Sequence, residues 1–196
     1  TRWATHGAPT ENNAHPHGTE RVSVVHNGII ENFEELRREL EEAGQVFSTE
    51  TDSETIAQLV DYHLQRGLSP REAAHACLKR LEGAYALAMI FAGHDGMVIG
   101  ARHGAPLVVG FGDNEMFLGS DSLALAPLTR RIAYLDDGDW AVITREGATF
   151  FDMAGNQVDR PIKVTALIAA AVGKDGYRHY MEKELHEHPV VIGQTL

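Results

Sequence analysis

The sequence contains a single cysteine, Cys77, among its 196 residues. One cysteine cannot form an internal disulfide, and sparse cysteine is typical of proteins that work in a reducing compartment. Long apolar segments are also missing, since no run approaches the roughly 20 residues that span a bilayer. No signal-peptide pattern stands at the start of the chain. These absences favour a soluble protein of the cytoplasm.

Positive charge is scarce as well. The chain has 17 lysines and arginines against 28 aspartates and glutamates, a formal net charge of -11 at pH 7. Binding to nucleic acid needs a basic face that meets the phosphates, so this balance argues against it. With 43% hydrophobic and 23% charged residues, the composition is that of a globular domain with its own core.

The chain also lacks an initiator methionine. It opens abruptly on TRWATHG, residues 1–7, which is dense in functional side chains. Domain termini are usually loose and polar. We therefore expect this chain to be a processed protein or a piece of a longer one.

Hydrophobic periodicity and capping signals predict a helical region followed by a strand-rich one. Short strands are expected at Val22–His26 and at Val46–Ser48. The first is expected to stop at Asn27-Gly28, a pair suited to a tight turn or to backbone with positive φ. Helices are expected over residues 32–44 with Asn32 as the cap, over 53–65, and over 69–81 behind a Ser69–Glu72 capping box. From Gly83 the period is that of strands, with seven candidates: Tyr85–Phe91, Met97–Ala101, Leu107–Phe111, Met116–Leu118, Ile132–Leu135, Trp140–Thr144 and Thr149–Phe151. This order indicates an α+β fold with largely antiparallel sheets.

The C-terminal part is less regular. Ser120 is expected to cap one helical turn that runs through Leu125, and residues 157–164 are poorly patterned. Tyr180–His188 could start a helix that Pro189 ends. We expect one domain over residues 1–165, then a linker and the start of a further domain over residues 166–196.

Three positions could bind or stabilise charge. Arg2 is either an exposed surface residue or a residue whose planar guanidinium binds a carboxylate. The run His26-Asn27-Gly28 is either a plain turn or an oxyanion hole, since an Asn amide and a Gly N–H can point at one oxygen. Asp52 is either a helix N-cap or a carboxylate that faces a substrate ammonium group, and one residue could do both.

Two histidine pairs have the spacing of metal ligands. His15-x-His17 falls in a loop, and His186-x-His188 falls on a helix, where residues two apart face different ways. Because no cysteine accompanies either pair, we predict no metal site.

Two further residues are possible nucleophiles. Cys77 lies on the probable buried stripe of its helix, which favours a core role over a reactive thiol. Thr1 could be an N-terminal nucleophile, but such enzymes need a lysine beside the terminal amine, and the nearest in sequence is Lys79.

Four motifs follow one another along the chain: TRWATHG at 1–7, NAHPH at 13–17, HNGIIEN at 26–32 and ETDSE at 50–54. Further on stand GAYALAMI, ARHGAPLVVG, GSDSLAL and YRHYMEKEL. Together they resemble the class II glutamine amidotransferase domain of the glucosamine-6-phosphate synthase family over nearly the whole chain. Amidophosphoribosyltransferases and asparagine synthetases share the Asn-Gly and Asp elements but not TRWATHG and YRHYM in this form.

This resemblance implies the four-layer αββα sandwich of N-terminal-nucleophile hydrolases, without its first strands. Arg2 would hold the α-carboxylate of glutamine beside Thr5 and His6, and Trp3 would belong to a loop that closes over the substrate. Asp52 would pair with the α-ammonium group.

By the same resemblance, the Gly28 carbonyl would help to bind the ammonium group, and the Asn27 amide and Gly28 N–H would form the oxyanion hole. The family's nucleophile is an N-terminal cysteine activated by its own α-amine, whose pKa of about 8 suits a general base. That cysteine would stand upstream of Thr1, and Cys77 does not replace it.

The implied activity is hydrolysis of L-glutamine. The ammonia would pass to a sugar isomerase domain of the same polypeptide, which converts fructose 6-phosphate to glucosamine 6-phosphate. No metal or organic cofactor is implied, and the full-length protein would be a homo-oligomer. The chain by itself is expected to be inactive. The alternatives are a non-catalytic ligand-binding piece and a threonine hydrolase built on Thr1.

Overall fold

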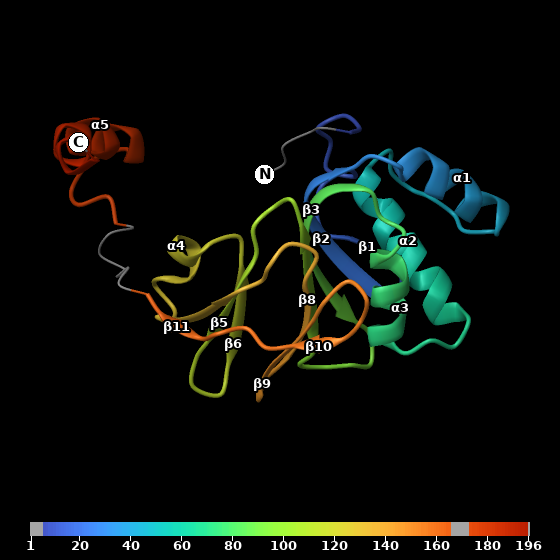
Figure 1. The fold of residues 1–196 in the computed structure, drawn as a ribbon. Coiled ribbons are helices and arrows are strands. Elements are labelled where there is room, and N and C mark those ends of the chain that lie inside the picture. Colours follow the sequence, from blue (N-terminus) through green and yellow to red (C-terminus); the bar gives the residue numbers. More distant parts are fainter. Residues whose placement is uncertain (1–5, 166–172, 196) are drawn as a thin grey trace.

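The computed structural model describes residues 6–165 and 173–195. Three helices cover one face of a seven-stranded sheet, and a four-stranded sheet packs on the opposite face (Figure 1). The fold is therefore α+β, with the layers in the order that the sequence predicts.

The three helices are α1 (Phe33–Glu42), α2 (Asp52–Gln65) and α3 (Pro70–Leu78). The capping box of α3 forms as predicted, because the Ser69 side chain accepts the Glu72 N–H and Glu72 accepts the Ser69 N–H. Asn32 precedes α1 but makes no capping hydrogen bond. Its amide instead donates to the Arg80 carbonyl and accepts from the Glu82 N–H.

Both sheets are antiparallel throughout. The larger has the order β1-β2-β3-β4-β8-β9-β10, and the smaller has the order β11-β7-β5-β6. The strands of the larger sheet are β1 (His17–Gly18), β2 (Val22–Ile30), β3 (Gly83–Phe91), β4 (Val98–His103), β8 (Trp140–Thr144), β9 (Gly147–Phe151) and β10 (Gln157–Val158). Those of the smaller are β5 (Val108–Phe111), β6 (Met116–Gly119), β7 (Arg131–Tyr134) and β11 (Lys163–Val164). All seven strands expected after Gly83 are present.

The larger sheet separates two hydrophobic cores. Successive side chains of a strand point to opposite faces, and both faces of the sheet are covered. In β8, Trp140 packs with the helices, whereas Ala141 packs with the smaller sheet. In β9, Phe151 packs with the helices and Phe150 packs with the smaller sheet.

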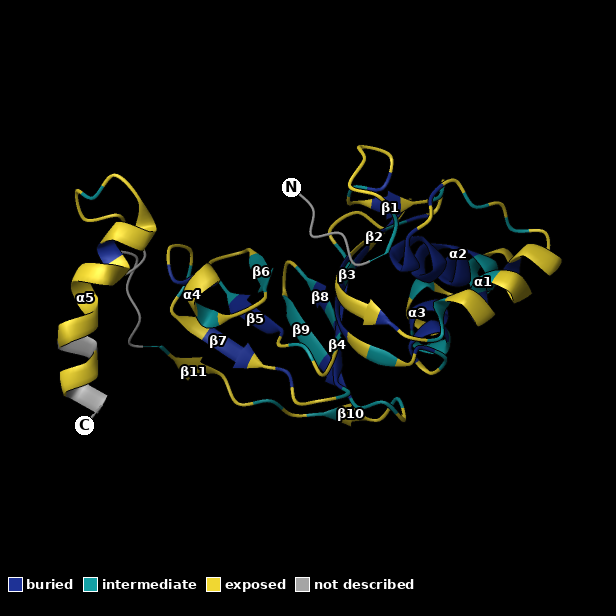
Figure 2. Ribbon diagram, turned by 90° about the horizontal axis from the view of Figure 1, so that it is seen from above, coloured by how far each residue is buried: buried dark blue, intermediate teal, exposed yellow. Residues whose placement is uncertain are grey.

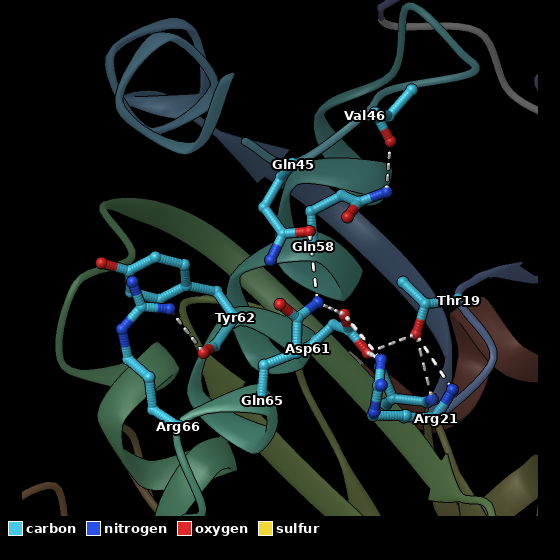
Figure 3. A network of polar contacts seen from close by, with 10 residues as sticks. Thr19, Arg21, Gln45, Val46, Gln58, Asp61, Tyr62, Gln65 and Arg66 are labelled. Atoms are coloured by element: carbon cyan, nitrogen blue, oxygen red, sulfur yellow. Dashed lines mark hydrogen bonds and ion pairs between the residues drawn. The ribbon is translucent and has the colours of Figure 1, made fainter. Parts of the chain in front are cut away.

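Helix α2 is the most enclosed of the three helices (Figure 2). Its buried Asp61 accepts hydrogen bonds from the Thr19 hydroxyl at 2.8 Å and from Arg21 Nη1 at 3.3 Å (Figure 3). Thr19 and Arg21 lie in the turn between β1 and β2, so this carboxylate fastens the middle of α2 to the start of β2.

A fourth layer lies on the outer face of the smaller sheet. It consists of α4 (Ser122–Leu125), whose Leu125 packs against Val108 and Ile132. The N-cap of α4 is Asp121, whose carboxylate accepts the Ala124 N–H, so the expectation of a Ser120 cap is wrong by one residue.

The last helix, α5 (Tyr180–Thr195), stands clear of the two sheets in both views (Figures 1 and 2). It continues through Pro189, contrary to expectation, because an interior proline removes one helical hydrogen bond without preventing later residues from being helical. None of the helices in the described ranges combines the length and apolar character needed to cross a membrane.

Of the two strands predicted near the N-terminus, the one at residues 46–48 is absent, and the one at residues 22–26 is present but extends further than predicted. Residues 46–48 pair with no strand, because side chains of α2 satisfy their backbone: Gln58 donates to the Val46 carbonyl, and Glu54 accepts the Ser48 N–H. In addition, β2 does not end at a turn but runs through Asn27-Gly28 to Ile30.

Candidate active site

The end of β2 requires glycine at position 28. Gly28 pairs with Tyr85 of β3 and has φ +134°. A Cβ there would lie 2.0 Å from the Ala84 carbonyl oxygen and 2.8 Å from the Tyr85 Cα, so no other residue fits. The glycine therefore lets the two strands approach closely, and the plain-turn interpretation of Asn27-Gly28 is wrong.

Asn27 and His26 lie on opposite faces of β2, as neighbours on a strand must. His26 is buried with Val24 on the face toward the helices, whereas Asn27 is exposed. Asn27 lines a cavity of about 220 Å³ between the two sheets, together with Ala86, Leu107, Leu118 and Ser120. A larger cavity, about 570 Å³ and lined by His94, Asp95 and Arg145 among others, contains none of the predicted site residues.

Asp52 is the first residue of α2, but it is not the cap. The cap is Thr51, whose hydroxyl accepts the Glu54 N–H at 3.2 Å. The Asp52 Oδ2 atom instead accepts the Ile30 N–H at 3.0 Å. This bond holds the carboxylate against β2, two residues beyond Gly28. The structure thus places the Asp52 carboxylate against the end of the strand that carries Asn27 and Gly28, and we call this end of β2 with the start of α2 the corner.

No lysine or arginine that the structure describes neutralises the charge of Asp52. Among residues 6–165 and 173–195, no lysine or arginine forms an ion pair with it. Among the described residues, the basic side chain paired with it is His26, with 3.8 Å between Nδ1 and Oδ2. Burial lowers the pKa of His26 to about 4, against the opposing effect of Asp52. His26 is therefore uncharged at neutral pH and does not form a charged pair with the carboxylate.

Glu54 is a site residue that sequence reasoning missed. Its buried carboxylate accepts four hydrogen bonds, from the N–H and hydroxyl of Ser48 and from the N–H and hydroxyl of Thr49. Burial alone would raise the pKa of Glu54, but these bonds more than offset it, and the pKa lies below its ordinary value. The Thr51-x-x-Glu54 spacing is that of a capping box and could have revealed it. Glu54 fixes the segment that leads into Asp52.

Side chains of the NAHPH motif, residues 13–17, contact the segment at the start of α2. Three of its side chains contact the ETDSE segment, residues 50–54. The Asn13 Oδ1 accepts the Glu50 N–H at 3.3 Å. The His15 Nε2 lies 3.2 Å from the Ser53 hydroxyl, and the His17 Nε2 lies 3.3 Å from the Thr51 hydroxyl. These histidines meet hydroxyl groups, and the described part of the chain gathers no three metal-binding side chains.

Asn13 also connects this corner to the start of the chain. Its Nδ2 donates to the Ala8 carbonyl at 3.0 Å, while Oδ1 holds Glu50. His6 packs on Phe33 of α1, with 4.6 Å between ring centroids. Arg2, Trp3 and Thr5 lie outside the described residues, as does Thr1.

The remaining sequence candidates lie elsewhere. Cys77 is fully buried in α3 with its Sγ 3.9 Å from the Ile56 carbonyl oxygen, and burial raises the pKa of its thiol. The core role predicted for it is confirmed. His186 Nδ1 lies 2.8 Å from the Glu182 carbonyl on its own helix, and His188 is exposed.

Comparison with solved structures shows the fold. Residues of this chain superpose on the glutamine phosphoribosylpyrophosphate amidotransferase from B. subtilis complexed with ADP and GMP, with a TM-score of 0.63 at 23% identity, over 76% of this chain and 34% of that one. A glutamine aminotransferase class-II domain protein from Silicibacter pomeroyi gives a TM-score of 0.50 at 20% identity, over 72% and 70%. These likenesses show the fold alone, and they confirm the predicted four-layer αββα sandwich.

Comparison with known sequences gives the family. The chain is 69% identical over its whole length to a glutamine–fructose-6-phosphate aminotransferase (isomerizing) of Gluconobacter oxydans, and 59% identical to one of Bradyrhizobium diazoefficiens. It spans 32% of the length of each relative. A family model described as a glutamine amidotransferase domain matches residues 5–127, which contain the whole corner built on Asn27, Gly28 and Asp52. The chain belongs to the glutamine amidotransferase domain family.

Proposed function

We propose that this chain is the glutamine-hydrolysing part of a glutamine–fructose-6-phosphate aminotransferase. The observation that carries the proposal is the corner at which Asp52 keeps an unneutralised carboxylate beside Gly28. The high identity to two such aminotransferases over the full chain supports it. The complete enzyme would use the ammonia from L-glutamine to convert fructose 6-phosphate to glucosamine 6-phosphate.

The corner suits an amino-acid ligand. The Asp52 carboxylate and the Gly28 carbonyl would bind the α-ammonium group, which is cationic at neutral pH. Arg2 would receive the α-carboxylate through its planar guanidinium, with Thr5 and His6 beside it. Opposite charges at the two ends of this clamp would orient the side chain of glutamine toward Asn27.

Asn27 and Gly28 would stabilise the negative charge that develops on the substrate oxygen during the reaction. Attack on the side-chain amide turns its carbonyl oxygen into an oxyanion, and the Asn27 Nδ2 and Gly28 N–H would donate to it. Because Gly28 has no Cβ, its backbone can come close to the ligand.

The nucleophile would be an N-terminal cysteine carried by polypeptide that precedes Thr1. Its sulfur attacks the amide carbon, its α-amine takes the thiol proton and passes it to the leaving ammonia, and water then cleaves the γ-glutamyl thioester. Cys77 is excluded from this role by its burial. Trp3 would close over the bound substrate.

The wider setting is proposed on the same basis. Residues 1–165 would form the glutaminase domain, and residues 166–196 would lead into a sugar isomerase domain of the same polypeptide. The complete enzyme would be a cytoplasmic homo-oligomer that needs no metal for glutamine hydrolysis.

The direct test is to assay the full-length protein for release of glutamate from L-glutamine, with and without fructose 6-phosphate. We expect glutamate and glucosamine 6-phosphate to form in equal amounts. Binding of L-glutamate without turnover by the full-length protein would instead support a non-catalytic ligand-binding role.

A further inference from the structure

Two hydrogen bonds fasten the first turn of α2 to β2, and they flank Asn27-Gly28. On one side, the Ile30 N–H donates to Asp52. On the other, the His26 Nδ1 lies 3.0 Å from the Ser53 hydroxyl. The geometry of the corner therefore depends on His26 as well as on the residues that would touch substrate.

The surroundings of His26 determine where its proton resides. Nδ1 has two oxygen atoms nearby, Ser53 Oγ at 3.0 Å and Asp52 Oδ2 at 3.8 Å. Nε2 is buried and has no hydrogen-bond partner in the part of the chain that the structure describes. A proton on Nδ1 is therefore favoured, because a buried N–H without an acceptor costs more than one that donates. Nδ1–H donates to Ser53, and the Ser53 hydroxyl is then free to donate to His15 Nε2, 3.2 Å away.

The same environment opposes a charge on His26. Protonation of Nε2 would create a buried N–H that no described group accepts, and His6, His15 and His17 lie close enough to repel a positive imidazolium. A charged His26 would also form an ion pair with Asp52 and cancel the carboxylate's charge. The neutral form avoids both consequences.

We propose that His26 is a positioning residue for substrate binding: it holds the first turn of α2 through Ser53 and, being uncharged, leaves the whole charge of Asp52 to the α-ammonium group of the substrate. The inference rests on the proposed function of this corner. An aliphatic side chain would meet the packing needs of this inward-facing strand position, so packing alone does not account for a histidine here.

A double-mutant cycle in the full-length enzyme tests this. His26→Leu removes the hydrogen bond, His26→Asn retains a donor near the position of Nδ1, and Asp52→Asn removes the charge that His26 is inferred to present. We expect His26→Leu to raise the KM for glutamine about tenfold with kcat changed less than about threefold. His26→Asn should stay within about threefold of the wild-type KM. In the Asp52→Asn background, His26→Leu should raise the KM for glutamine by less than about twofold beyond the value of Asp52→Asn alone.

Equal effects of His26→Leu in both backgrounds would overturn the inference, because His26 would then act independently of Asp52. A His26→Asn enzyme as impaired as His26→Leu would also overturn it. If His26→Leu does not fold, as judged by thermal unfolding, the Ser53→Ala variant breaks the same bond from its other side. The cycle with Asp52→Asn is then repeated with Ser53→Ala and has the same expected outcome.

The cycle also separates this inference from the proposed function. A full-length wild-type enzyme that releases no glutamate would overturn both. An active enzyme in which Asp52→Asn binds glutamine normally would overturn the role of Asp52, and with it that of His26. An active enzyme that requires Asp52 but shows an additive cycle would overturn the His26 inference alone.

Discussion

The carboxylate of Asp52 accepts the backbone N–H of Ile30 at 3.0 Å, which places the start of α2 beside the end of β2. One carboxylate oxygen is thus committed to the protein backbone, and no lysine or arginine of the described residues competes for the charge. In the function proposed above, this carboxylate would receive the α-ammonium group while it keeps its bond to the Ile30 N–H.

Loss of the Asp52 charge should weaken ligand binding. We expect Asp52→Asn in the full-length protein to reduce the affinity for L-glutamate by roughly 2–5 kcal/mol, the usual cost of removing one partner of a buried charged contact. Arg2→Ala should have an effect of similar size at the other end of the ligand. Isothermal titration calorimetry measures both, with Asp95→Asn in an exposed turn as the matched control. Unchanged affinity in Asp52→Asn would limit the residue to its bond with Ile30.

Loss of the Asn27 amide should act on turnover. Asn27→Ala should reduce glutaminase kcat by about 100- to 1000-fold, because an oxyanion donor matters chiefly when charge develops on the oxygen. Glutamine binding should change little. Steady-state kinetics measures both quantities, and Asn156→Ala, in the turn between β9 and β10, is the control for the same chemical change elsewhere. Near wild-type turnover would remove Asn27 from the mechanism.

Loss of the Asn13 amide should disconnect the start of the chain from the Asp52 segment. Asn13→Ala removes the bonds to Ala8 and Glu50, so we expect a loss of roughly 1–3 kcal/mol in the free energy of unfolding. It should also raise the KM for glutamine, because Ala8 would no longer be held against the segment that leads into Asp52. Asn12→Ala, which removes a single exposed bond to the Ser48 carbonyl, is the control. A Tm and KM equal to those of the control would contradict this role for Asn13.

The burial of His26 predicts a pH dependence of stability. Its pKa is lowered to about 4 in the folded chain, so between about pH 6.5 and pH 4 the unfolded chain binds a proton here that the folded chain does not. The corresponding stability is present above pH 6.5 and is lost as the pH falls. Urea unfolding of the chain should show a decrease of roughly 1–3 kcal/mol across this window, and His26→Asn should reduce it.

His63 should also lower the stability of the folded chain as the pH falls, in the same direction as His26. Burial, Arg80 and Arg66 lower the pKa of His63, so His63→Gln is the comparison variant. If His26→Asn leaves the pH slope unchanged while His63→Gln reduces it, the neutral state of His26 in the folded chain is wrong.

Chemical labelling should distinguish the possible nucleophiles. A glutamine analogue with an electrophilic side chain should modify the N-terminal cysteine of the full-length enzyme and leave Thr1 of this 196-residue chain unlabelled. Cys77 should react slowly at most, because it is buried and its thiol pKa is raised. Peptide mapping identifies the site. Stoichiometric labelling at Thr1 would make the chain a threonine hydrolase.

The helices and strands whose hydrophobic residues recur with a clear period were predictable from the sequence. The capping box at Ser69 and the strands from β3 to β9 follow local rules, and the structure confirms them. The two-residue strands β1, β10 and β11 were not predictable, because so short a segment has no period and exists only through its partner.

The candidate site was predictable in part. The motifs around Asn27, Gly28 and Asp52 singled out residues that the structure brings to one corner. Their contacts could not be read from the sequence, since the Asp52–Ile30 and His15–Ser53 bonds join residues far apart in the chain. At Asn27-Gly28 the sequence left a tight turn and positive-φ backbone open, and the structure shows the second, in a strand whose neighbour comes too close for a Cβ.

The attachment of α2 to β2 has a consequence for motion. Asp52 and Ser53 hold the first turn of the helix, and Asp61 holds the helix nine residues further on through Thr19 and Arg21. These two attachment points along the helix oppose both sliding and rotation, so we expect α2 and β2 to move together as one unit. We then expect any closure around a ligand to involve other segments of the chain.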